Sequence, residues 1–168
     1  GGGKQLTELA HKLGVVQPVI GGRRVTDDDT LDLAKMIFRG KINTEILAQF
    51  RRRGVSAVGL SGVDGGVVKA VKRPPKDVVN KQTGETETVD FGHVGDVVEI
   101  DASLINTLLD SGYLPVISSL GADDDGKIFN INADTIASEI AASLHAEKLI
   151  LLTDVNGIYL NEGDENTK

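Results

Sequence analysis

The chain has 168 residues and a mass of 17.8 kDa, which suits one domain with a hydrophobic core. Its 18 basic and 25 acidic residues give a formal charge of −7, which argues against nucleic acid or an anionic membrane as a partner. No apolar run approaches the ~20 residues that cross a bilayer. The absence of cysteine excludes disulfides and thiolate metal sites, which fits a cytoplasmic protein without requiring one.

Helices are predicted wherever apolar residues recur at helical spacing. The first begins directly after a Gly1-Gly2-Gly3 turn. Glycines mark most of the expected ends, because a residue in the left-handed conformation commonly terminates a helix. The predicted helices are 4–13, 30–39, 43–53, 102–111 and 134–145, and the terminating glycines are Gly14, Gly40, Gly54 and Gly112.

Short apolar runs between these helices predict strands, and the alternation indicates an α/β layer fold with a mostly parallel sheet. Near 67–91 the pattern changes. Two prolines precede two short strand patterns that flank a Lys81–Gly84 turn, which predicts a projecting β-hairpin or flap. The predicted strands of the sheet are Ala57–Leu60, Val67–Val71, Val97–Ile100, Leu114–Ser118 and Leu149–Leu152.

Both ends of the sequence have the character of internal segments. A glycine-rich turn normally follows a strand, and none precedes Gly1. The last predicted strand runs into a polar stretch that starts at Asp154. We therefore expect residues 1–168 to be a single, incomplete domain from a longer protein.

The segment Asn130-Ile131-Asn132-Ala133-Asp134 is the most informative motif. If it begins as an extended strand, the amides of Asn130 and Asn132 point the same way. Asp134 then lies at the start of a helix, where a carboxylate can accept backbone N–H groups or hold a cation. Two amides and a carboxylate can bind a small polar ligand there; alternatively, Asp134 caps the helix and the asparagines serve the turn.

Other polar clusters also follow predicted strands, where ligands bind in α/β sheets. In Gly21-Gly22-Arg23-Arg24-Val25-Thr26, a guanidinium can bind a ligand carboxylate or offset the acidic residues that follow. The glycine turn at 59–66 can contact a ligand or simply join two strands. The turn at 153–158 can meet a nucleotide or merely end its strand.

Several residues predict no site. The three histidines lack the spacing of a metal site, so no metal ligands are predicted. The sequence shows no Ser/His/Asp or Cys/His set and no phosphate-binding GxxxxGK[ST] loop. We expect the basic residues Lys69, Lys72, Arg73 and Lys76 to form a solvated face of the hairpin.

The order of the motifs resembles the amino-acid kinase family, and within it the acetylglutamate kinases. The resemblance runs over nearly the whole chain, through the GGG turn, GGRRVT, GLSGVDG, GYLPVISS, NINAD and LLTDVNGI. It implies a three-layer αβα sandwich and a homodimer or a hexamer built from dimers. It also implies phosphorylation of the side-chain carboxylate of N-acetyl-L-glutamate by ATP with Mg²⁺, in arginine biosynthesis.

The resemblance also assigns roles to residues. Gly2 and Gly3 would meet substrate and phosphates through backbone N–H groups, and Arg24 would hold the α-carboxylate of the substrate. Asn130 would bind the acetylamino acid with Asn132 beside it, and Asp134 would orient the lysines that clamp the transferred phosphoryl group. The ATP site would be lined by Asp154, Val155, Asn156, Gly157, Ile158 and Tyr159.

The sequence departs from the family pattern because neither clamping lysine has a matching motif in it. The chain alone is therefore expected to be inactive or nearly so. Two alternatives stay open: a related kinase for carrier-linked aminoadipate or glutamate, and a non-catalytic ligand-binding module of the same fold. A glutamate side chain has a pKa of about 4.3 and is already ionised at neutral pH, so the proposed chemistry requires no general base.

Overall fold

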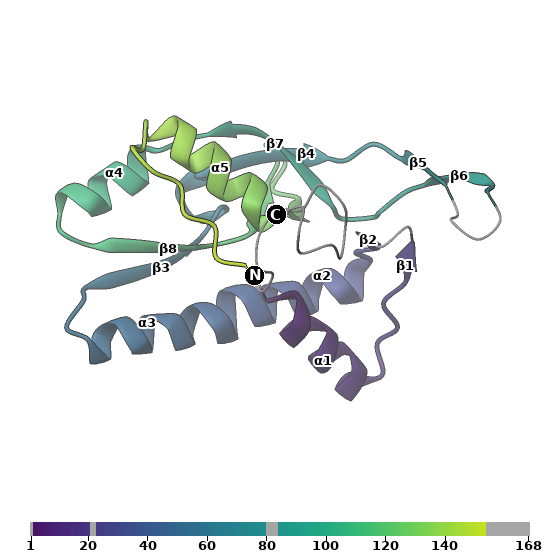
Figure 1. Ribbon diagram of the computed structural model, residues 1–168, viewed down its shortest axis with the longest axis horizontal. Helices are drawn as coiled ribbons and strands as arrows, with labels where there is room; N and C mark the ends of the chain where they lie inside the picture. Colours follow the sequence, from purple (N-terminus) through teal and green to yellow (C-terminus); the bar gives the residue numbers. More distant parts are fainter. Residues whose placement is uncertain (1, 21–22, 80–83, 154–168) are drawn as a thin grey trace, which may run out of the picture.

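The computed structural model describes residues 2–20, 23–79 and 84–153, and it places a pair of parallel strands between helices (Figure 1). β3 (Ala57–Ser61) pairs in parallel with β8 (Leu114–Ser118). α3 (Asn43–Arg52) contacts both strands, and α4 (Ser103–Asp110) contacts β8. The predicted α/β class and layered arrangement are confirmed.

One buried side chain joins α3 to both strands. Asn43 is 2 % exposed, and its Nδ2 donates to the carbonyl oxygens of Leu60 in β3, at 3.4 Å, and Val116 in β8, at 2.8 Å. Its Oδ1 would lie 1.9 Å from a Cβ placed on Gly59. Glycine is therefore required at position 59 for the helix and the strand to approach this closely.

The first half of the chain forms a helical layer. α1 (Gly3–Leu13) ends at Gly14, which has a left-handed φ of 70° as expected. α2 (Asp28–Ala34) begins at Asp27, whose carboxylate accepts the Thr30 N–H at 2.8 Å. The two helices bury a common core, whose main members are Leu6, Ala10, Leu33, Ala34, Ile37 and Phe38.

The expected helix end at Gly40 is wrong. α2 continues through a π-helical segment, η1 (Lys35–Ile42), directly into α3. A glycine inside a helix costs about 1 kcal/mol relative to alanine, whereas burial of one large apolar side chain contributes roughly 1.5–3 kcal/mol. The packing of Ile37 and Phe38 against α1 therefore outweighs the local preference to stop.

A second sheet has the strand order β10-β9-β4-β7. Its β4–β7 and β10–β9 pairs are antiparallel, and β4 meets β9 in parallel. α5 (Ala133–Ser143) contacts β7 and covers a core that includes Val68, Phe129 and Ile136. The strands are β4 (Val68–Lys72), β7 (Gly95–Ile100), β9 (Leu120–Ala122) and β10 (Ile128–Asn130).

The hairpin predicted near 67–91 is confirmed. β5 (Lys76–Val79) and β6 (Thr86–Val89) pair antiparallel and project from the body of the molecule (Figure 1). The turn residues 80–83 lie outside the described part of the chain. Two further short strands, β1 (Val19–Ile20) and β2 (Arg23–Arg24), form a small antiparallel pair.

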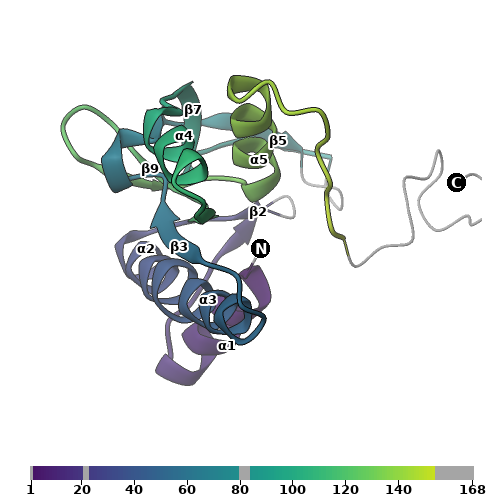
Figure 2. The same ribbon diagram turned by 90° about the vertical axis from the view of Figure 1, so that its left-hand side faces the viewer.

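The predicted strand at Leu149–Leu152 is not formed. These residues follow α5 as an extended, irregular segment (Figure 2), and Leu152 is 95 % exposed. Their apolar character suits a buried strand, but a strand forms only where another backbone edge accepts its hydrogen bonds. In the described part of the chain no helix is long and apolar enough to span a membrane.

Candidate functional site

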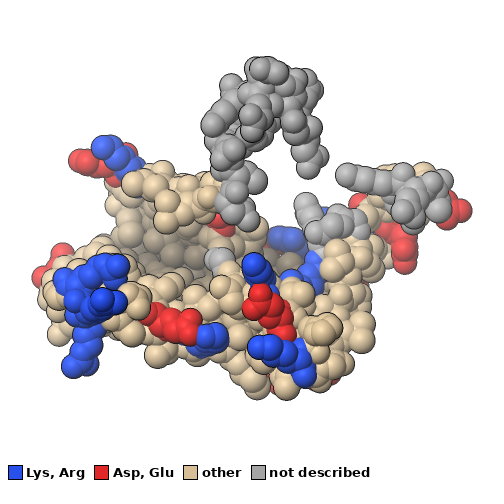
Figure 3. All heavy atoms as spheres, turned by 60° about the horizontal axis from the view of Figure 1, so that its bottom comes forward, with Lys and Arg blue, Asp and Glu red and all other residues tan. Residues whose placement is uncertain are grey.

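A polar cavity of about 620 Å³ brings together four of the six predicted site residues that lie in the described part of the chain. It lies between the start of α1, β2, the base of the hairpin and the β10–α5 junction. Figure 3 shows one face of the molecule, which is hollowed, with basic side chains to the right of the hollow. The lining includes Gly3, Arg24, Asn130 and Asn132 from the prediction, together with Phe38, Arg73, Lys76, Phe91, Val94, Ser119, Ile131, Ala133 and Thr135.

Arg24 brings a positive charge without a carboxylate partner to this cavity. Its Nη2 donates to Thr7 Oγ1 at 2.6 Å and to the Gly3 carbonyl at 3.3 Å, and no described carboxylate lies within ion-pair distance. Its Nε is buried without a hydrogen-bond partner among the described residues. Burial lowers the pKa of Arg24, although an arginine stays protonated at neutral pH. A buried, unpaired N–H beside a cavity suits a ligand acceptor.

Asn130 stands at the end of β10 and is held by two contacts. Its backbone N–H donates to the His93 carbonyl at 2.8 Å, and its Nδ2 donates to Thr26 Oγ1 at 3.3 Å. Thr26 is fully buried, and its own N–H donates to the Phe91 carbonyl. The amide oxygen of Asn130 accepts no hydrogen bond from the described residues and is available to a ligand.

The helix cap at this junction is Asn132 rather than Asp134. Asn132 Oδ1 accepts the Thr135 N–H at 2.9 Å, and α5 begins at Ala133. Asp134 is exposed in the first turn of α5 and does not line the polar cavity, although both of its chain neighbours do. The prediction that Asp134 might itself cap the helix is wrong, because the residue two positions earlier already has the extended backbone that a cap requires.

Gly2 and Gly3 form the N-terminus of α1. Gly2 has a φ of 107°, and a Cβ there would lie 2.5 Å from Ile42 Cδ1. Only glycine therefore fits this position without displacing its neighbours. The first turn of α1 contains no acidic residue, so its free N–H groups and the positive end of the helix dipole remain available to an anion.

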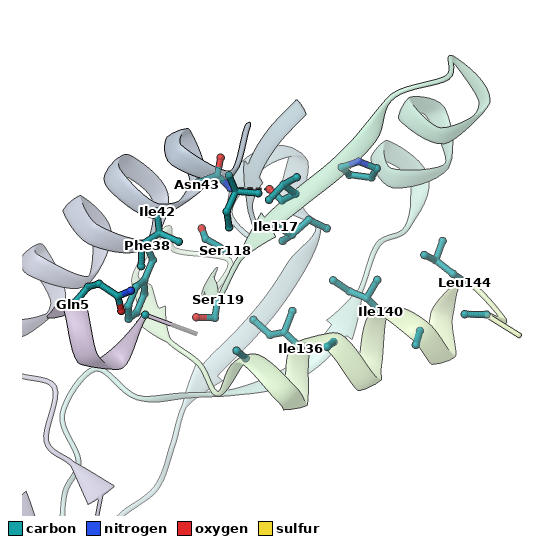
Figure 4. Close-up of a pocket in the computed structure, with 18 residues that line it drawn as sticks. Gln5, Phe38, Ile42, Asn43, Ile117, Ser118, Ser119, Ile136, Ile140 and Leu144 are labelled. Carbon is teal, nitrogen blue, oxygen red and sulfur yellow. Dashed lines mark hydrogen bonds between the residues drawn. The ribbon is translucent and has the colours of Figure 1, made fainter. Parts of the chain in front are cut away.

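An apolar cavity of about 540 Å³ adjoins the polar one. The two share Phe38, Ser119 and Ala133 in their linings, and Gly2 lines the apolar cavity. In Figure 4, Ser118, Ser119 and Ile136 surround its space, and a dashed line marks the hydrogen bond from Asn43 to Val116. The N-terminus of α1 thus lies where the two cavities meet.

Sequence reasoning missed two of the basic residues in the polar cavity. Arg73 and Lys76 line it. Lys76 is exposed, as expected for a solvated face, whereas Arg73 is half-buried. Lys69 and Lys72 do lie outward, paired with Asp124 and Asp90. The only feature of the sequence that could have indicated this position is the Pro74-Pro75 pair. The two prolines interrupt the extended chain between β4 and β5, so side chains on either side of them need not alternate between faces in the usual way.

The turn at 59–66 serves structure rather than this cavity. Asp64 accepts hydrogen bonds from the backbone N–H and the Oγ of Ser61, both at 2.6 Å, and lies 3.6 Å from Arg39 Nε. Burial acts to raise the pKa of Asp64, but these hydrogen bonds and the arginine outweigh it and lower the pKa. None of the turn residues lines the polar cavity.

One part of the prediction falls on residues that the structure does not describe. The proposed ATP-binding residues 154–159 lie outside the described part of the chain. Within residues 2–20, 23–79 and 84–153, no group of three or more histidine, aspartate or glutamate side chains is placed to hold a metal ion.

Comparison with known proteins places the whole chain in one family. The family description "Amino acid kinase family" matches residues 1–168. An acetylglutamate kinase from Carboxydothermus hydrogenoformans is 44 % identical over 167 residues, which is 99 % of this chain and 56 % of that protein. One from Methanocorpusculum labreanum is 48 % identical over 166 residues, or 98 % and 55 %. The chain thus spans about half the length of these curated relatives.

Solved structures agree with this assignment. Smu.665 from Streptococcus mutans UA159 superposes with a TM-score of 0.73 at 32 % identity, covering 92 % of this chain and 60 % of that one. N-acetylglutamate synthase from Neisseria gonorrhoeae, complexed with coenzyme A and N-acetyl-glutamate, gives a TM-score of 0.70 at 28 % identity. That comparison covers 95 % of this chain and 34 % of the synthase.

Proposed function

Because the chain belongs to the amino acid kinase family, we propose that it forms part of an enzyme that transfers a phosphoryl group from ATP to N-acetyl-L-glutamate. The product would be N-acetyl-L-glutamyl 5-phosphate, an intermediate of arginine biosynthesis. The relatives named acetylglutamate kinase support this substrate. The observation that carries the proposal is a polar cavity lined by both Arg24, whose Nε has no hydrogen-bond partner among the described residues, and Asn130.

The geometry suits a reaction that requires positioning rather than proton transfer. The acceptor carboxylate is ionised at neutral pH, so the site has to orient it and offset the negative charge of two reacting anions. The N-terminus of α1 offers N–H groups at Gly2 and Gly3 for this purpose. Arg24 would hold the α-carboxylate at the other end of the amino acid.

The remaining roles follow the motifs. Asn130, with its free amide oxygen, would bind the acetamido group, and Asn132 lies beside it at the start of α5. Asp134 stands between Ala133 and Thr135, which both line the cavity, and would orient clamping lysines. Residues 154–159 would contact ATP.

Mg²⁺ would enter with the nucleotide. This ion is usually bound through phosphate oxygens and one or two carboxylates, so it does not require a preformed cluster of acidic residues. When bound, it would neutralise charge on the phosphates. We propose a cytoplasmic homodimer or hexamer for the complete protein, and light scattering would measure its mass.

The direct test is a hydroxylamine-trapping assay with the longest reading frame that contains these residues. Mg-ATP and N-acetyl-L-glutamate should produce a hydroxamate from the acyl phosphate. Product with carrier-linked aminoadipate or glutamate, and none with N-acetyl-L-glutamate, would reject the substrate. Binding of N-acetyl-L-glutamate without any product would instead favour a non-catalytic module.

A further inference from the structure

The charges that line the polar cavity are unbalanced. Three basic side chains line it, from Arg24, Arg73 and Lys76, and its lining contains no aspartate or glutamate. Arg73 is neutralised, because its Nε and Nη2 both donate to Asp96 Oδ1, at 2.9 and 2.6 Å. Two cations therefore remain without a carboxylate partner among the described residues, Arg24 and Lys76.

The hairpin places Lys76 at the cavity through a constrained route. Arg73 anchors the strand with its N–H to the Val94 carbonyl, at 2.8 Å, and with its ion pair to Asp96. Pro74 and Pro75 follow, and each fixes its own φ near −65°. Lys76 then begins β5, opposite the buried Val89. Few rotatable bonds separate the anchored Arg73 from Lys76.

Two carboxylates close to Lys76 in the chain or across the hairpin bind other groups. Asp90 pairs with Lys72 at 2.6 Å, and Asp77 accepts the Thr88 hydroxyl at 2.6 Å. Lys76 lines the cavity and forms no ion pair with the described residues, so its ammonium group is available to a ligand anion. Lys72, at the end of β4, is therefore neutralised, whereas Lys76, at the start of β5, is available.

Arg24 can offer only some of its N–H groups to a ligand anion, so a second cation can bind the same anion. Its Nη2 is occupied by Thr7 and Gly3, so the guanidinium cannot offer all of its N–H groups to a ligand. In the function proposed above, the side-chain carboxylate of the substrate reacts at the N-terminus of α1. The α-carboxylate is then the anion that Arg24 and a second cation can share.

We propose that Lys76 is a specificity-determining residue that recognises, together with Arg24, the non-reacting carboxylate of the substrate. This inference rests on the proposed function. Lys76 would make the site prefer an acylated amino acid that bears two carboxylates over one that has a neutral group in place of the α-carboxylate.

The test compares two substrates that share the same acceptor carboxylate. N-acetyl-L-glutamate keeps its α-carboxylate, whereas N-acetyl-L-isoglutamine has a neutral α-amide in that place. Both are assayed with wild type, Lys76→Met and Lys72→Met in the longest reading frame that contains this chain. Lys72→Met is the matched control, because Lys72 is a lysine four residues earlier, at the end of β4, that pairs with Asp90 and does not line the cavity.

Lys76→Met should lower kcat/KM for N-acetyl-L-glutamate about tenfold, as expected for one charge-assisted contact at a partly exposed site. It should change kcat/KM for the α-amide by no more than about twofold, because the partner charge is absent. Lys72→Met should leave both values near wild type, and Lys76→Arg should restore part of the preference. An equal loss on both substrates, or no loss on either, overturns the role.

A binding experiment distinguishes failure of the proposed kinase function from failure of the proposed role of Lys76. If wild type phosphorylates neither compound, calorimetric titration of both compounds into wild type and Lys76→Met decides the question. A preference for the dianion that Lys76→Met loses supports the recognition role. A preference that persists in Lys76→Met, or that wild type lacks, overturns it.

Discussion

Asn130 Nδ2 donates to Thr26 Oγ1 at 3.3 Å, although 104 residues separate them in the chain. This contact joins the two motifs on which the interpretation of the sequence depends, GGRRVT and NINAD. Because Thr26 is fully buried, it offers Asn130 a fixed partner and leaves the amide oxygen free. Arg24 lies two residues before Thr26, and both Arg24 and Asn130 line the polar cavity.

Replacement of Arg24 by alanine should impair binding of the amino acid more than turnover. Removal of a charge-assisted contact to the α-carboxylate should raise KM for N-acetyl-L-glutamate by a factor of roughly 10 to 100, which corresponds to about 1.5–3 kcal/mol. Steady-state kinetics would measure it, with Arg52→Ala as the control because Arg52 is exposed at the end of α3. An unchanged KM would remove Arg24 from the substrate site.

Substitution of Asn132 should affect mainly stability, whereas substitution of Asp134 should affect mainly activity. Asn132→Ala removes the cap of α5 and should lower the free energy of unfolding by about 1 kcal/mol. Asp134→Asn should leave stability nearly unchanged, since Asp134 makes no described hydrogen bond, but should reduce kcat if it orients the clamping lysines. Denaturant unfolding and kinetics on both variants test this. Full activity in Asp134→Asn would contradict the catalytic role.

Two glycine-to-alanine substitutions should change the free energy of unfolding in opposite directions. Gly2→Ala forces a left-handed φ on alanine and a Cβ 2.5 Å from Ile42 Cδ1, so it should destabilise by roughly 2–4 kcal/mol. Gly40→Ala introduces a Cβ with nothing within 4 Å and should stabilise by about 0.5–1 kcal/mol. Thermal unfolding of the pair measures the difference. Similar Tm values for the two variants would contradict the packing described at Gly2.

Asp27 should stabilise the fold near neutral pH, and this contribution should be lost in acid. Hydrogen bonds from Thr30 lower the pKa of Asp27 below its ordinary value of 3.8. A carboxyl with a depressed folded pKa stabilises fully above its unfolded pKa, and the contribution is lost as pH falls through the folded value. Asp27→Asn keeps a capping oxygen but cannot titrate. Its free energy of unfolding should therefore fall less than that of wild type below about pH 4.

Denaturant unfolding at a series of pH values would show this difference. Asp29→Asn is the control, because Asp29 is an exposed neighbour in the first turn of α2 with no described hydrogen bond. The same flattening of the pH profile in both variants would mean that the Asp27–Thr30 contact is not its source.

Helix and strand positions were largely predictable because they depend on local periodicity and on turn residues. The boundaries of α1, β3 and β8 lie within one or two residues of prediction, and the hairpin around 80–83 is confirmed. The predictions failed where a distant partner decided the outcome. The helix runs through Gly40 because α1 packs against Phe38, and Leu149–Leu152 form no strand because no described edge pairs with them.

By itself, the sequence determined the fold class, the family and the residues Gly3, Arg24, Asn130 and Asn132 of the cavity, since each belongs to a motif with its own chemical pattern. Only the tertiary structure decided which basic residues of the hairpin face the cavity. Lys72 and Lys76 look alike in the sequence. Their surroundings differ because two prolines separate them and because Asp90 forms an ion pair with Lys72, whereas Lys76 lines the cavity. Such a distinction depends on contacts between segments, which local periodicity does not encode.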